Sequence, residues 1–193
     1  MSSNSITYII DGCINANRQY QKELYRRYYA LAYNICMRYC NVVDDTSELI
    51  NDGFLKIFNS IHKFTPKYDN LEASLEGWIK SIMVHTAIDH FRKNKRNFLL
   101  KDLDDDDVAF SDGDVSVIDT MAYKELLELV QQLSPGYRAV FNLYVIDGYK
   151  HEEIANKLRI SVGASKSNLA KARRSIRTMI TDKKIQIYGL RAI

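Results

Sequence analysis

Residues 150–174 read KHEEIANKLRISVGASKSNLAKARR, and this stretch decides the fold of the C-terminal part of the chain. Apolar residues recur at helical spacing as far as Leu158, the repeat breaks over 159–161, and Leu169 resumes it. Small Ala155 allows two helices to cross closely. The pattern predicts a helix-turn-helix. Its second helix spans about 162–178, and its basic outer side is suited to contact DNA phosphates and to enter a groove of the duplex. This side is made of Lys166, Lys171, Arg173, Arg174 and Arg177.

Two shorter helices are predicted immediately upstream. Leucine and valine recur every three or four residues from Leu126 to Leu133, which is typical of an amphipathic helix. Ser134 is placed to cap the next helix and Pro135 to occupy its first position. That helix is expected to carry Val140, Phe141 and Tyr144 and to end near 147–148.

The N-terminal part contains three longer helical patterns. The first predicted helix spans about 18–39, and a second follows a break over 41–46, where aspartate and threonine are placed as capping groups. A loop over 64–71 contains one of the two prolines. A third helix, about 75–95, turns Trp78, Ile79, Ile82, Met83, Ala87 and Phe91 to its core side.

Charge is segregated along the chain. Residues 99–120 contain eight aspartates and one lysine, a local charge of −7, so the remainder carries +10 within a total of +3. This stretch lacks apolar periodicity, and we interpret it as a flexible, self-repelling linker. The predicted fold is all-α, with two small helical bundles in residues 1–98 and 121–193 joined by the acidic linker over 99–120.

The bulk composition is that of a soluble globular protein. The 193 residues are 46% hydrophobic and 26% charged, and no apolar run approaches the roughly 20 residues of a membrane span. The N-terminus lacks a secretory pattern, so we expect a cytoplasmic protein without membrane insertion. Cys36 and Cys40 lack accompanying ligands and are expected to be buried thiols, and no metal or other cofactor is predicted.

Two polar groups of residues lie on the predicted N-terminal helices. Acids gather near the start of the second helix, where the helix dipole favours them, and a solvated face explains them as well as a binding surface does. They are Asp44, Asp45, Glu48 and Asp52. On the third helix, Ser81, His85, Asp89 and Arg92 form a polar row at spacings of four, four and three, and a basic run covers 92–96.

The chain resembles the extracytoplasmic-function class of bacterial sigma factors in two ordered blocks, about 20–96 and 123–177. Residues 44–58, DDTSELINDGFLKIF, are similar to the family's acidic helix start and the Phe-Leu-Lys-like segment after it. The family's Trp-led helix is matched by Trp78, Ala87, Asp89 and Arg92, with His85 in place of an Asn. The second block matches through LSP at 133–135, EEIA at 152–155, Gly163, Lys166, Ser167, Leu169, Ala172 and Arg173.

This resemblance implies a non-enzymatic factor that binds core RNA polymerase and directs it to promoters. Its implied partners are the clamp coiled-coil and flap of the polymerase, promoter DNA and an anti-sigma factor. The implied polymerase contacts are Asp44, Asp45, Glu48, Leu49 and Asp52.

The resemblance also implies two DNA contacts. The minus-10 element would be held by Tyr68, Asn70, Lys80, His85, Asp89, Arg92 and Lys93, with a pocket for extruded bases in the loop over 64–70. At the minus-35 element, Lys166, Ser167, Asn168, Ala170 and Lys171 would face bases, while Lys150, Arg173 and Arg177 would meet phosphates. Asn168 is suited to a bidentate pair with adenine.

Three residues depart from the family's pattern. Lys150 stands at a capping position where the family commonly has Ser or Thr, and an ammonium cannot accept a hydrogen bond. Ser165 stands where a Val is usually buried, which predicts either looser packing or a bond to the carbonyl four residues earlier. His85 in place of Asn changes the donors near the minus-10 element.

Two other functions remain open at this point. A dimeric helix-turn-helix regulator would use the N-terminal part as a sensor or dimerisation module. A DNA-processing enzyme would use the motif for docking alone, but the carboxylates form no dyad with a nucleophile that the sequence reveals. A regulator would bind a palindrome without polymerase, whereas a sigma factor would need core polymerase for strong binding.

Overall fold

The computed structural model describes residues 5–40, 43–99 and 123–189, with side chains for 5–40, 46–93 and 125–182. The chain divides into two compact units, Met1–His90 and Phe91–Ile193. Every regular element in the described part is helical, which confirms the all-α prediction. The predicted linker lies outside these residues except for Leu99, and the predicted domain limits stay a prediction.

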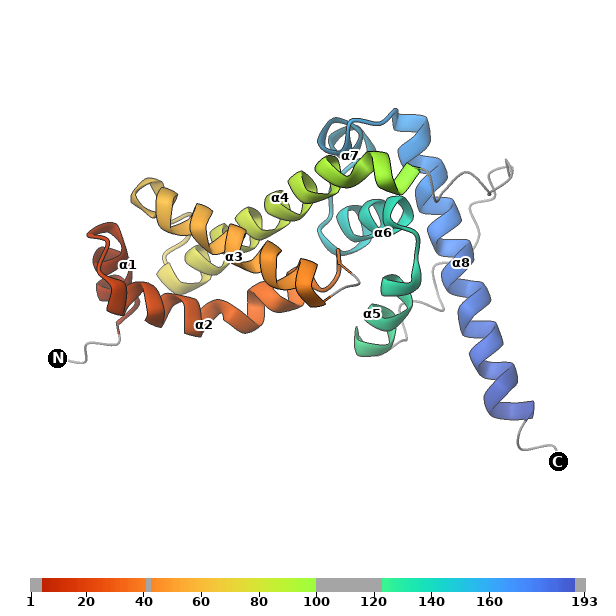
Figure 1. Ribbon diagram of the computed structural model, residues 1–193, viewed down its shortest axis with the longest axis horizontal. Coiled ribbons are helices and arrows are strands. Elements are labelled where there is room, and N and C mark those ends of the chain that lie inside the picture. The colour runs from red at the N-terminus through yellow and green to blue at the C-terminus, as the bar shows by residue number, and fades with distance from the viewer. Residues whose placement is uncertain (1–4, 41–42, 100–122, 190–193) are drawn as a thin grey trace. The chain divides into compact units, whose positions relative to one another are not determined.

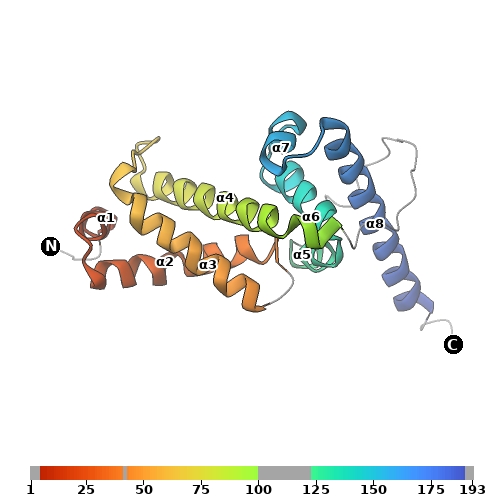
Figure 2. The same ribbon diagram turned by 45° about the horizontal axis from the view of Figure 1, so that its top comes forward.

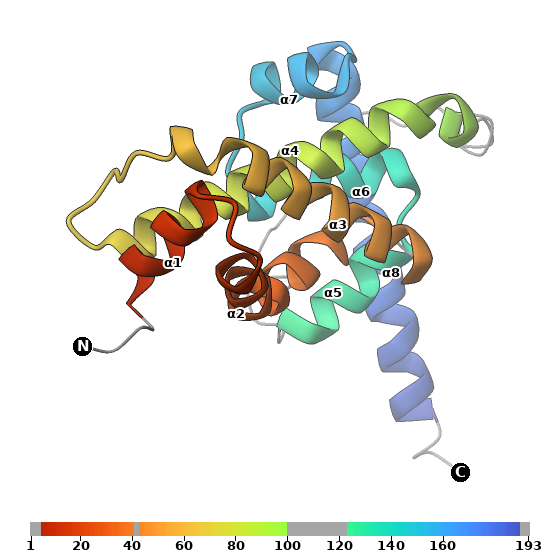
Figure 3. The same cartoon turned by 60° about the vertical axis from the view of Figure 1, so that its left-hand side comes forward.

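The first unit is an arrangement of amphipathic helices around one apolar core. Its elements are α1 (Ile6–Ile14), α2 (Arg18–Cys36), α3 (Val43–Ser60), η1 (Ile61–Lys63) and the greater part of α4 (Leu71–Leu99). Helix α1 crosses the start of α2, α3 runs back along α2, and α4 returns beside α3 (Figure 1, Figure 3). Their buried side chains include Leu24, Ile35, Phe54, Ile57, Leu75, Ile79 and Met83.

Helix α1 was absent from the prediction. It buries Ile9, Ile10 and Cys13, which repeat at helical spacing. Its contact with α2 is close at Gly12, where an added Cβ would overlap the ring of Tyr20. Glycine is therefore required at this crossing, and a glycine inside a short helical pattern weakens its signal in the sequence.

Two boundaries differ from the predicted ones. Helix α2 ends at Cys36, three residues early, because residues 37–39 form a turn whose amides bond to carbonyls of the last helical turn. Helix α3 already begins at Val43, so Thr46 lies inside the helix, buried, with its hydroxyl 3.6 Å from the sulfur of Met37. The prediction that Thr46 caps the helix was wrong.

The second unit contains the helix-turn-helix. Its elements are α5 (Tyr123–Gln132), α6 (Pro135–Phe141), the π-helical turn η2 (Asn142–Ile146), α7 (His151–Leu158) and α8 (Val162–Gly189), together with the end of α4. Helices α5, α6 and α7 pack on α8, whose C-terminal end continues beyond them (Figure 2). The predicted core is confirmed by the burial of Ile154, Ala155, Leu158, Leu169, Ala172 and Ile176.

The junction at α6 corrects two details. Pro135 occupies the first helical turn as predicted, but the Ser134 side chain makes no capping bond, and its hydroxyl is buried without a hydrogen-bond partner in the described residues. The helix then widens into η2, which leaves Tyr144 36% exposed. Tyr144 therefore lies on a π-helical turn rather than on the regular helix that the prediction extended to 147–148.

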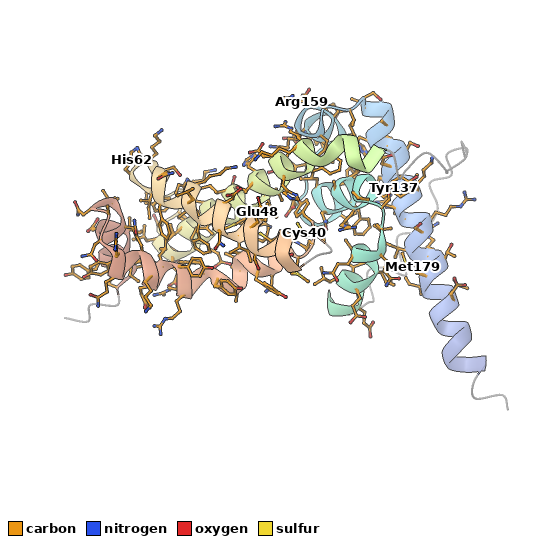
Figure 4. The ribbon with its side chains drawn as sticks, in the orientation of Figure 1. Cys40, Glu48, His62, Tyr137, Arg159 and Met179 are labelled. Atoms are coloured by element: carbon orange, nitrogen blue, oxygen red, sulfur yellow. The ribbon has the colours of Figure 1, made fainter. Side chains whose placement is uncertain are left out.

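The turn between α7 and α8 is set by two residues. Arg159 ends α7 in the left-handed conformation, with φ 54°, and is labelled in Figure 4. Ser161 caps the start of α8, because its Oγ accepts a hydrogen bond from the amide of Ala164 at 3.0 Å. Helix α7 thus ends on an arginine in a conformation that favours glycine, and α8 starts on a serine cap.

We expect Arg159→Gly to stabilise the second unit by about 1 kcal/mol, because glycine removes the steric cost of the left-handed conformation. Denaturant unfolding of the full chain measures this change. Arg174→Gly is the matched control, since Arg174 is exposed inside α8, where glycine costs about 1 kcal/mol. Equal destabilisation by both substitutions would contradict the strain at Arg159.

Candidate nucleic-acid interface

The structure describes the side chains of two of the four acids predicted on α3. Glu48, labelled in Figure 4, and Asp52 are exposed one helical turn apart. Leu49 is only 1% exposed and belongs to the core, and its contact with polymerase stays a prediction. Asp44 and Asp45 lie in the first turn of α3, and their side chains are outside the described ones.

The loop over 64–70 is held by a buried serine that the prediction did not include. Ser74 Oγ accepts hydrogen bonds from the amides of Lys67 and Tyr68, at 3.2 and 2.9 Å. Phe64 packs on Trp78 with ring centroids 5.5 Å apart, so these rings support the loop. The Tyr68 side chain, in contrast, is 66% exposed to solvent.

Asn70 has a local structural role. Its Oδ1 accepts a hydrogen bond from the amide of Ala73 at 3.0 Å, which explains why α4 begins at Leu71 rather than near 75. One acceptor of this predicted minus-10 residue is thus engaged by the helix start.

The predicted polar row on α4 is present, but Lys80 lies apart from it. His85 is exposed, with Nδ1 3.4 Å from the Ser81 hydroxyl, and Asp89 pairs with Lys56 of α3 at 3.0 Å. Arg92 is half-buried and Lys93 exposed farther along the helix. At about 100° per residue, Lys80 points roughly 140° away from His85 around the axis. Lys80 therefore belongs to another side of α4.

Helix α8 separates a buried side from a basic outer side. Ser165, Leu169, Ala172 and Ile176 are buried. At about 100° per residue, Ser167 lies opposite them, with Lys166 and Asn168 about 100° to either side. Ala170 and Lys171 follow on the outer side one turn later, while Arg173 and Arg177 lie on the edge that Lys166 begins.

The outer side of α8 therefore has a polar middle and one strongly basic edge. This arrangement fits a helix in a groove, whose middle meets bases and whose edge meets a phosphate wall. Exposed Arg174 lies near the middle of this outer side, farther along the helix, and the predicted contacts did not include it.

Lys150 precedes α7 without capping it. The side chain is exposed and makes no capping hydrogen bond, as predicted for an ammonium. The opposite half of a capping box is present, because the Glu153 carboxylate accepts a hydrogen bond from the Lys150 amide at 2.8 Å. The Lys150 ammonium is thus left to face solvent.

Ser165 has a hydrogen-bond partner that the prediction did not include. It is fully buried, and its Oγ lies 2.9 Å from Nδ1 of His151, the first residue of α7. Nothing in the sequence predicts this pair, because its members are 14 positions apart and lie on either side of the turn. The hydroxyl is therefore satisfied across the helix-turn-helix rather than within α8.

All three cysteines are buried, as predicted for Cys36 and Cys40. Cys13, Cys36 and Cys40 are free thiols, and burial raises the pKa of Cys36 to about 12. Within residues that the structure describes, no group of three or more histidines, cysteines and acids is placed to hold a metal ion. In the same part of the chain, no helix is long and apolar enough to span a membrane.

Comparisons with known proteins match both units. Residues 24–97 match the family model "Sigma-70 region 2", which contains the acids of α3, the loop and the polar row of α4. Residues 123–176 match "Sigma-70, region 4", which contains the helix-turn-helix. The two models occur in the order that the two blocks of the sequence predict.

Individual relatives show the same relationship. The chain is 24% identical over 158 residues to the ECF RNA polymerase sigma factor SigE of Mycolicibacterium smegmatis, covering 80% of this chain and 59% of SigE. It is 26% identical over 164 residues to the ECF sigma factor SigW of Bacillus subtilis, covering 78% of this chain and 83% of SigW.

A solved structure of the sigma factor RpoE from Bartonella quintana with the anti-sigma factor NepR is similar at 17% identity, with a TM-score of 0.46, over 83% of this chain and 96% of that one. The two family models and the relatives agree with the residues that carry the resemblance. This chain belongs to the sigma-70 family, as a factor of the extracytoplasmic-function class.

Proposed function

We propose that this chain binds core RNA polymerase, recognises minus-10 and minus-35 promoter elements and promotes opening of the duplex, without an enzymatic step of its own. One observation carries the proposal: a region 2 unit precedes a region 4 unit whose α8 presents a polar and basic outer side. The polymerase would supply catalysis, and this chain would supply promoter recognition.

The polymerase contact is proposed for the acidic side of α3. Glu48 and Asp52 are exposed together, and Asp44 and Asp45 precede them in the same helix. A basic coiled-coil of the clamp is the complementary partner, because opposite charges steer association and fix orientation. The flap is the proposed partner of the second unit.

The minus-10 contact is proposed for the loop over 64–70 and the polar row of α4. Exposed Tyr68 offers a ring on which an unpaired base can stack, while the loop backbone is held in place by Ser74. His85, Arg92 and Lys93 supply donors along α4, and Asn70 and Asp89 complete this set. Lys80 lies on another side of α4, and its contact with the minus-10 element stays a prediction. A held loop lowers the ordering cost of capturing a base.

The minus-35 contact is proposed for α8 in the major groove. Lys166, Ser167, Asn168, Ala170 and Lys171 would face base edges. Arg173 and Arg177 on one edge of α8, and Lys150 before α7, would meet phosphates. Phosphate contacts would position the helix, and the polar side chains would distinguish sequences.

The cellular setting follows from the same proposal. A factor that works with RNA polymerase acts in the cytoplasm of a bacterium, and we place this chain there. An anti-sigma factor is a further proposed partner, which would regulate access to the polymerase.

The dependence of DNA binding on core polymerase tests the proposed function. A library of random duplexes is incubated with the full chain alone, with core polymerase alone and with both, and the retained DNA is sequenced. We expect enrichment of two spaced elements only when both proteins are present. Enrichment of a palindrome by the chain alone would instead identify a dimeric regulator and contradict the proposal.

A further inference from the structure

His151 links three elements of the second unit. Its ring stands at the start of α7, and Nδ1 lies 2.9 Å from Oγ of Ser165 in α8. The same ring stacks on Tyr144 of η2, with centroids 4.5 Å apart and planes 25° apart. Arg173 of α8 reaches the Tyr144 ring in turn, 5.9 Å from its centroid. The imidazole therefore joins α7, α8 and the π-turn.

The position of Ser165 gives this link its importance. Ser165 is fully buried on the core side of the first turn of α8, directly before Lys166, Ser167 and Asn168. A hydrogen bond is directional, whereas packing between apolar groups is not. A bond from this turn to α7 therefore restricts the rotation of α8 about its own axis.

We propose that His151 and Ser165 are positioning residues for DNA reading: their hydrogen bond fixes the first turns of α8 so that Lys166 and Asn168 meet their bases. This inference rests on the proposed role of α8 at the minus-35 element. Rotation by one residue step, about 100°, would turn each outer side chain to another direction. A pair that limits this rotation thus acts on sequence discrimination more than on general attraction to DNA.

The surroundings of His151 favour its neutral form. Burial lowers its pKa below 6.5, Lys166 and Arg173 of α8 lower it further, and Glu152 of α7 opposes them. Exposed Lys150 precedes the ring in the chain, and the ring of Tyr144 covers one face. Ser165 can donate to or accept from Nδ1, so protonation would leave the bond possible but add a positive charge beside Lys166 and Arg173.

The sign of the pH dependence follows from this lowered pKa. The folded chain binds the His151 proton less tightly than the unfolded chain does. The contribution of neutral His151 to the stability of the fold is therefore complete above pH 6.5 and declines as the pH falls below that value. We expect the unfolding free energy of the wild type, relative to that of His151→Gln, to decrease as the pH falls from about 8 to about 5. A difference that stays constant with pH would contradict a neutral His151.

The pair is tested with the full chain and core polymerase on two duplexes. One carries the sequence that wild type enriches from a random library, and the other carries the same bases scrambled in the minus-35 element. His151→Leu leaves the buried Ser165 hydroxyl unpaired, and Ser165→Val leaves Nδ1 of half-buried His151 unpaired. The double variant replaces the pair by two apolar groups. Ser165→Thr keeps a hydroxyl, and exposed His62→Leu in the first unit is the matched control.

We expect each single variant to lower the ratio of selected to scrambled affinity by about 10-fold, with scrambled affinity unchanged. Ser165→Thr should recover most of the ratio, and His62→Leu should keep it. The double variant should recover stability but keep the lowered ratio, because it lacks the hydrogen bond. Singles that melt at a lower temperature but keep the wild-type ratio would show a purely structural pair and overturn the inference. Failure of wild type to enrich any sequence would instead overturn the proposed function and the inference with it.

Discussion

Glu48→Arg combined with Asp52→Arg is expected to lower the affinity for core polymerase by about 100-fold. Both carboxylates are exposed on one side of α3, one turn apart, so the double substitution replaces two attractive contacts by two repulsive ones. Steered association between charged surfaces is strongest at low salt. Titration of labelled core polymerase at two ionic strengths measures the loss, which should shrink as salt rises.

The control for this substitution lies in the same unit. Glu76 of α4 is also exposed, so Glu76→Arg makes the same kind of charge change outside the acidic side of α3. It should change core affinity by less than about threefold, the range of an exposed charge. Equal losses for Glu76→Arg and the α3 variant would show a general charge effect, and an unchanged affinity for the α3 variant would remove that surface from the polymerase contact.

Asn168→Ala is expected to remove discrimination at one base pair of the minus-35 element. Its half-exposed amide lies on the opposite flank of the outer side from Lys166, and a bidentate pair with adenine contributes about 1–3 kcal/mol, or roughly 5- to 150-fold. Holoenzyme affinity for duplexes that carry each of the four bases at every minus-35 position measures this loss.

The variant should bind the four bases almost equally at one position and keep its preferences elsewhere. Exposed Asn59 of α3 provides the control, and Asn59→Ala should leave every preference unchanged. If Asn168→Ala weakens all promoters by the same factor, Asn168 contacts the backbone or supports the fold, and base reading by this residue is wrong.

The helix-turn-helix was predictable because its core repeats at short range. Ile154, Leu158, Leu169 and Ile176 are all buried where the helical period places them. Helix α1 has the same kind of repeat, but it is short and contains Gly12. The requirement for glycine at this position becomes clear only from its close contact with the Tyr20 ring. Local patterns thus foretold long helices better than a short helix with a tertiary contact.

The sequence-based predictions failed or were incomplete where a side chain has more than one possible partner or environment. Ser134 has the residue type and position of a cap but makes no such bond, whereas Ser74 and Ser161 bond to backbone amides that the sequence alone did not single out. Leu49 stands among exposed acids in the sequence but faces the core, because neighbouring helix residues point about 100° apart.

Contacts between elements could not be read from spacing. The pairing of Ser165 with His151 depends on how α7 and α8 cross, and the exposure of Tyr144 depends on the π-turn. Neither has a local signature in the sequence. The departure at Ser165 from the family's usual valine was nevertheless visible in the sequence. It marked the position at which the structure forms the hydrogen bond between α8 and His151 of α7.

Run-off transcription with purified core polymerase and genomic fragments is the most direct test of the central claim. We expect discrete transcripts only when the full chain is added, each starting downstream of the two elements that the holoenzyme enriches. Glu48→Arg with Asp52→Arg should abolish them, while Glu76→Arg should not. Transcripts that are identical with and without the chain would contradict its assignment as a promoter-recognition subunit.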